Sequence, residues 1–159
     1  MPGSQPGMKW RCMKQLPEEK HMDKLCEAVK QYGPLAGRIL LSLMFIISGW
    51  GKITGFAGTA GYMASKGMPF AQLLLVGAII VELGGGLMLL VGWKARLAAL
   101  AIFLFIIPAT LFFHDFWAAD AAQAQNQMIH FMKNLTIMGG MLYVMAFGAG
   151  PFSLDARKN

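Results

Sequence analysis

Residues 70–92 read FAQLLLVGAIIVELGGGLMLLVG, an apolar run whose one charged residue is Glu82. A helix of this length crosses the roughly 30 Å hydrocarbon core of a bilayer. A charge near the middle of that core costs about 2.5 kcal/mol or more, so Glu82 needs a partner, a proton or a water-filled cavity inside the protein. The run therefore predicts a membrane-spanning helix and marks Glu82 as a candidate functional residue.

We expect residues 70–91 of this run to span the membrane, and three more apolar segments accompany it. They cover about 35–54, 97–113 and 129–147, each close to the length of about 20 residues that a span requires. The composition agrees, because 56% of the residues are hydrophobic and 14% are charged, against about 25% charged in soluble domains. We expect an all-α fold, an integral membrane four-helix bundle in residues 34–159, in contact with the lipid bilayer. Near the ends of the first span, Arg38 and Lys52 are long enough to reach the interfaces.

Residues 1–33 form a basic tail with the pattern of an amphipathic helix. Pro17 suits a first helical turn, and apolar residues then follow at spacings of three and four: Met22, Leu25, Cys26, Val29 and Tyr32. This pattern predicts a helix on the membrane surface that enters the bundle at Gly33–Pro34. The alternative is a solvated helix that packs only on its own bundle.

The distribution of basic residues predicts the orientation. Seven Lys or Arg lie between Lys9 and Arg38, and others lie in the turn 92–96 and at 157–158, all on one side of the predicted bundle. The positive-inside rule then places both termini in the cytoplasm. The net charge of +6 is explained by this topology, so we expect no nucleic-acid partner.

Polar residues gather at the opposite, outer side of the predicted bundle. His130, Lys133 and Asn134 share one helical face, which should point into the bundle because lipid offers it no partner. Lys52 ends the first span on that side, and His114 with Asp115 ends the third. An outward-facing polar pocket is the prediction, with Glu82 at its deeper end.

These residue types suit quinone chemistry. Histidine titrates near neutral pH, and burial disfavours the charged form of a carboxylate, so both can exchange protons. We assign proton transfer to Glu82, His114 and His130, and binding of a quinone or quinol to Lys52, Lys133, Asn134 and Asp115. In the alternative interpretation, Glu82 pairs with Lys52 or Lys133 as a structural clamp, and the histidines only end helices.

Haem and metal sites are not predicted. His114 and His130 could in principle ligate a haem, but no CxxCH attachment motif occurs. Met128 and Met132 flank His130, which allows a copper site, yet methionine more often fills gaps in apolar interfaces.

The chain resembles the DoxX-like family of small four-helix membrane proteins. The resemblance rests on GRILLSLMFIISGWGKITGF (37–56), VELGGGLMLLVGWKAR (81–96), ATLFFHDFW (109–117) and MIHFMKNLTIMGG (128–140). Its specific motifs are SGxxK, the Glu-Leu-Gly-Gly-Gly run, HDFW and FxKN, which contain all the candidate residues except His130; His130 is adjacent to the last. The resemblance also implies a bacterial inner membrane location and relatedness to the membrane subunit of a thiosulfate:quinone oxidoreductase, or to membrane partners of thiol-oxidoreductase or superoxide-detoxifying assemblies.

Three functional hypotheses follow. The first is a quinone-binding subunit that works with a soluble or membrane redox protein; whether the chain is itself an enzyme stays open. The second is a non-catalytic scaffold or assembly factor. The third is a small-molecule or ion carrier, for which four helices would have to form a homo-oligomer.

Overall fold

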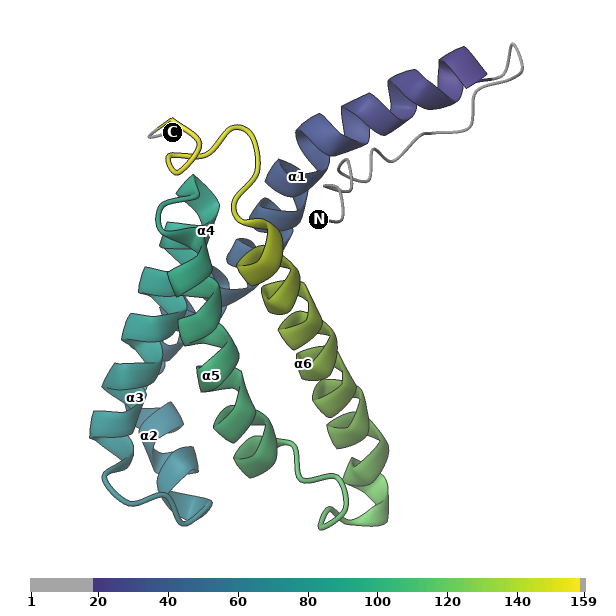
Figure 1. Ribbon diagram of the computed structural model, residues 1–159. Helices are drawn as coiled ribbons and strands as arrows, with labels where there is room; N and C mark the ends of the chain where they lie inside the picture. Colours follow the sequence, from purple (N-terminus) through teal and green to yellow (C-terminus); the bar gives the residue numbers. More distant parts are fainter. Residues whose placement is uncertain (1–18, 158–159) are drawn as a thin grey trace, which may run out of the picture.

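The computed structural model describes residues 19–157, and within them the chain is helical and contains no strand (Figure 1). The helices are α1 (Glu19–Thr54), α2 (Phe56–Ser65), α3 (Ala71–Ile79), a short π-helix η1 (Ile80–Gly84), α4 (Gly85–Val91), α5 (Ala95–Phe113) and α6 (Ala121–Phe147). The all-α prediction is confirmed.

Three helical segments in this part of the chain are long and apolar enough to cross a membrane: Met22–Thr54, Ala71–Val91 and Ala95–Phe113. The predicted fourth span, 129–147, lies in α6. That helix is long enough but less apolar, because His130, Lys133 and Asn134 lie within it. It packs along α5, and its membrane crossing stays a prediction.

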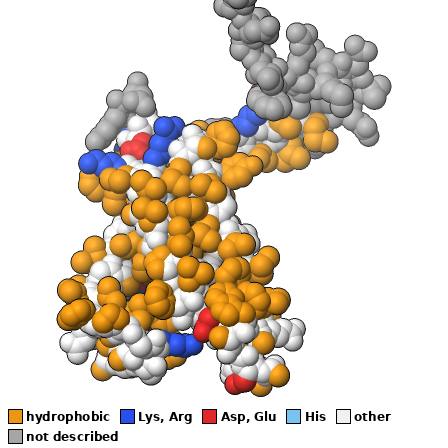
Figure 2. Space-filling model, turned by 60° about the horizontal axis from the view of Figure 1, so that its bottom comes forward, with side chains coloured by type: hydrophobic (Ala, Val, Ile, Leu, Met, Phe, Trp, Pro, Cys, Tyr) orange, Lys and Arg blue, Asp and Glu red, His pale blue; other side chains and the backbone are white. Residues whose placement is uncertain are grey.

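The long helices converge at one end of the bundle and spread apart at the other (Figure 1). We call the first the basic end; it holds the turn 92–96 and the segment 148–157. The second, the α2 end, holds α2 and the loop 114–120. Between the two ends the visible face is mostly hydrophobic (Figure 2), as expected for a surface in contact with lipid.

The main core lies in the half of the bundle nearest the basic end. There α1 packs along α4, and α5 packs along both α4 and α6. Leu89, Ile102 and Met141, from three different helices, are completely buried. A smaller cluster at the α2 end joins Met63 of α2 to Leu75 of α3.

The C-terminal segment closes the basic end. Asp155 accepts hydrogen bonds from the backbone N–H of Lys94 (2.8 Å) and Ala95 (2.9 Å), so it satisfies the free donors at the start of α5. Gly92 has a φ of +67°, which a glycine adopts without strain, and it lets the chain turn from α4 toward α5.

One expectation about α1 is wrong, because Arg38 does not reach an interface. It is 2% exposed, lies against Gly92, and donates to the carbonyl of Phe152 at 2.9 Å. The helix also continues through Pro34, so the tail helix and the first span are one element. Proline removes one backbone hydrogen bond, and the remaining bonds of this 36-residue helix are sufficient to continue it.

The apolar stripe of the tail helix is exposed at Met22, Leu25, Val29 and Tyr32. Its position on a membrane surface stays a prediction, and residues 1–18 lie outside the described part of the chain.

Candidate functional site

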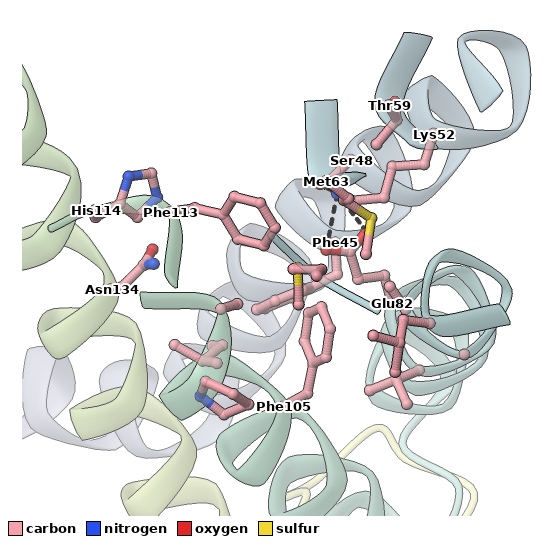
Figure 3. A pocket seen from close by; sticks show the side chains of 18 of the residues that line it. Phe45, Ser48, Lys52, Thr59, Met63, Glu82, Phe105, Phe113, His114 and Asn134 are labelled. Atoms are coloured by element: carbon pink, nitrogen blue, oxygen red, sulfur yellow. Dashed lines mark hydrogen bonds and ion pairs between the residues drawn. The ribbon is translucent and has the colours of Figure 1, made fainter. Parts of the chain in front are cut away.

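A cavity of about 620 Å³ lies between α1, α2, α3, η1, α5 and α6, in the half of the bundle nearest the α2 end (Figure 3). This volume is within the range of about 300–1,000 Å³ that is typical of small-molecule sites. Most of the lining is apolar, with aromatic and methionine side chains between two polar groups.

The first polar group is an ion pair between α1 and η1. Lys52 Nζ lies 3.0 Å from Oε1 and 2.9 Å from Oε2 of Glu82, and it also donates to Ser48 Oγ at 2.7 Å. The Glu82 side chain is 6% exposed and that of Lys52 is 25% exposed. The predicted pairing of Glu82 with Lys52 is therefore present, and both residues line the cavity.

Local backbone geometry brings this pair together. Glu82 lies in the π-helical turn, where an extra residue per turn changes the direction in which side chains point. On α1, Gly49 lies so close to η1 that an added Cβ would be 2.7 Å from Leu83 Cγ and 3.3 Å from Glu82 Cβ. Only glycine allows this approach, which places Ser48 and Lys52 beside the carboxylate.

The second polar group joins α5 to α6. Asn134 Nδ2 donates to Thr110 Oγ1 at 2.9 Å, and His114 Nδ1 lies 3.0 Å from Gln127 Oε1. The rings of His114 and His130 are stacked with their centroids 5.1 Å apart. These contacts form a polar surface between the two helices.

Lys133 extends this surface, because its Nζ lies 3.2 Å from His130 Nδ1. An ammonium group has only donors, so Nδ1 of His130 must accept and the ring proton must be on Nε2. At His114 the partner is an amide oxygen, so Nδ1 donates there.

The structure brings together most of the predicted site residues. Five line one cavity: Lys52, Glu82, His114, Lys133 and Asn134. His130 contacts two of them but does not line the cavity. Asp115 does not line the cavity. It pairs with Lys66 at 3.3 Å, with both side chains about one third exposed.

Sequence reasoning missed three polar neighbours of the site: Ser48, Thr110 and Gln127. Helical spacing could have found them. Ser48 precedes Lys52 by four residues, and Thr110 precedes His114 by four, so each lies on the same face as a recognised candidate.

These features define a helical membrane protein with a buried ion pair in a largely apolar cavity. The profile of the DoxX family matches residues 33–115, a segment that contains both Lys52 and Glu82, and the chain belongs to this family.

Curated relatives support the assignment. The chain is 42% identical to the inner membrane protein YqjF of Escherichia coli, over 82% of this chain and 95% of the relative. It is 33% identical to the inner membrane protein YphA of the same organism, over 77% of this chain and 88% of the relative. A Surfeit locus protein 4 homolog of Schizosaccharomyces pombe is 27% identical over 81% of this chain, which spans 38% of that protein. No solved structure matches the chain significantly.

Proposed function

We propose that this protein is a subunit of a redox assembly in the bacterial inner membrane and that its cavity binds a quinone or quinol. One observation carries the proposal: a buried ion pair, Lys52–Glu82, lines a cavity that is otherwise mostly apolar. A quinone head group has a flat apolar ring and an oxygen at each end, and it needs a donor near each oxygen. The names of the two bacterial relatives support the inner membrane location.

The cavity has donors at both ends and apolar side chains between them. Figure 3 shows Phe45, Phe105, Phe113 and Met63 between the ion pair and the polar group of α5 and α6. In the proposed binding mode, Lys52 donates to one quinone oxygen. Asn134 or Lys133 donates to the other, because each keeps a further N–H beyond its observed hydrogen bond.

The ion pair also provides a route for protons. Oxidation of a quinol releases two electrons and two protons, and reduction of the quinone takes up both. Glu82 accepts one proton from the hydroxyl that faces Lys52, and His114 accepts the other at Nε2, since its Nδ1 is bound to Gln127. The electrons pass to or from a partner protein that carries a redox centre.

The proposed orientation places both termini in the cytoplasm. The basic end carries Lys94, Arg96 and Arg157, and the positive-inside rule assigns such an end to the cytoplasm. The α2 end then faces the periplasm, and the cavity lies nearer that side.

A scaffold function is the second candidate. It is favoured by the pairing of Glu82 with Lys52, because a clamp between two helices needs no ligand. Under that hypothesis, substitutions in the cavity would leave the function of the assembly intact.

Binding of a short-chain quinone to the purified protein in nanodiscs distinguishes the two. Lys133→Ala is the informative variant, because Lys133 lines the cavity but is exposed, so its loss leaves the fold intact. We expect saturable micromolar binding that Lys133→Ala weakens about tenfold, which is the usual effect of losing one charged hydrogen bond. The control is Lys66→Ala, which removes a lysine of the α2 end that does not line the cavity. Absence of saturable binding by folded wild-type protein refutes the quinone proposal.

A further inference from the structure

The cavity reaches the surface of the bundle between α3 and α5. Leu73, Leu74 and Gly77 of α3 line the cavity and are also exposed, and Pro108 of α5 does the same. Leu73 is 71% exposed. A residue that is both in the lining and on the surface marks the rim of an opening.

This opening lies at the depth of the lipid tails. Gly77 is six residues from the start of α3, and Pro108 is five residues from the end of α5. At 1.5 Å per residue, both are about 8–9 Å inside the α2 end of their helices. A segment of 21 residues such as Ala71–Val91 is about as long as the hydrocarbon core is thick, so the opening faces acyl chains and not water.

The π-helical turn is where α3 and α5 separate. α5 packs on α4 and on η1, and beyond η1 it has no comparable packing against α3. Toward the α2 end the gap is closed again, because Tyr62 of α2 stacks on Phe113 with ring centroids 5.8 Å apart. The opening is therefore bounded by η1, α2, α3 and α5.

We propose that this opening is a lateral portal and that the isoprenoid tail of a membrane quinone leaves the cavity through it. This inference rests on the proposed function and narrows its substrate class to long-tailed quinones taken up from the bilayer. The rim residues on α3 and α5 are all apolar, as an isoprenoid tail requires. The cavity also has exposed lining residues on α1 and α6, Met44 and Lys133, but Lys133 carries an ammonium group. An apolar tail would bury that charge at high cost.

Blocking the portal should weaken binding of a quinone that carries an isoprenoid tail and leave binding of the head group alone nearly unchanged. Gly77→Trp is the variant of choice, because a Cβ at Gly77 has no neighbour within 4 Å and the indole can extend across the opening. The matched control is Gly139→Trp on α6, which also has open space at its Cβ and does not line the cavity. Both variants are compared with wild type in nanodiscs, with a tailless benzoquinone and with the same head group carrying several isoprene units.

We expect Gly77→Trp to weaken binding of the tailed quinone by about tenfold or more, a loss typical of steric overpacking. Binding of the tailless quinone should change less than twofold in this variant, and Gly139→Trp should change neither. Equal binding of the tailed quinone to Gly77→Trp and wild type overturns the portal. If wild type binds neither quinone, the proposed function itself fails, which is a different result.

A second measurement decides the case in which Gly77→Trp loses both ligands. A quinone with a photoreactive group at the end of its tail is cross-linked to wild-type protein. Labelling of the exposed surfaces of α3 and α5 supports the portal, whereas labelling confined to α1 and α6 overturns it.

Discussion

Replacing Lys52 by methionine would leave Glu82 as a buried charge with no cation beside it. Removal of one member of a buried ion pair commonly costs about 3–5 kcal/mol, because the remaining charge keeps its desolvation penalty. Lys52 is 25% exposed, so solvent already weakens the pair, and the expected cost lies at or just below the lower end of that range. We expect Lys52→Met to reduce the free energy of unfolding by about 2–3 kcal/mol.

A double-mutant cycle isolates this effect. The double variant Lys52→Met/Glu82→Met removes both charges and keeps similar side-chain volumes, so it should be more stable than Lys52→Met alone by about 2 kcal/mol. Unfolding is followed in detergent micelles by circular dichroism during denaturant titration. The control is Lys66→Met, which breaks a pair whose side chains are about one third exposed and should cost less than about 1 kcal/mol. If Lys52→Met were as stable as wild type, the ion pair would add nothing to the stability of the folded protein, which would refute this reasoning.

Three further predictions concern the basic end and the cavity. Asp155→Ala removes two hydrogen bonds to the start of α5 and should lower stability by about 1–2 kcal/mol, measured by thermal unfolding; unchanged stability would contradict the capping role. Gly92→Ala forces a side chain into a φ of +67° and against Arg38, so it should cost about 2 kcal/mol or more in the same assay, and full stability would contradict this tight contact. Glu82→Gln keeps the side-chain shape but removes the proton acceptor. Quinone-dependent turnover of the assembly should therefore fall about 100-fold or more, while quinone still binds. Unchanged turnover would exclude proton transfer by Glu82.

The helices could be predicted from the sequence because each apolar run is as long as a span. The predicted run of residues 70–91 became Ala71–Val91, and 97–113 became Ala95–Phe113. The predicted fourth span begins near 129, whereas the helix that contains it, α6, already begins at Ala121. Asp120 accepts a hydrogen bond from the backbone N–H of Gln123 at 2.9 Å, so a capping residue was present in the sequence. It was missed because the residues that follow are not apolar.

The candidate site could be predicted to the extent that it depends on depth in the membrane. Glu82 lies near the middle of Ala71–Val91 and Lys52 lies in the last turn of α1. They meet because a buried carboxylate needs a nearby cation and the lysine side chain is long enough to reach it. The π-helical turn could not be predicted, because it depends on how η1 packs against Gly49 of α1. The burial of Arg38 was also beyond sequence reasoning, since its partner Phe152 is 114 residues away along the chain.

The distribution of packing in the bundle favours a binding site over a clamp. Near the basic end the helices are closely packed, with Leu89 and Ile102 completely buried and the C-terminal segment bound across the turn. A clamp needs no cavity beside it, and it could equally lie in such surroundings, where close packing excludes water and strengthens the attraction between charges. The Lys52–Glu82 pair lies instead beside a cavity of about 620 Å³. There the bundle lacks the van der Waals contacts that larger side chains would make across this space. Such a loss of packing next to an ionisable pair is expected where a ligand completes the interior.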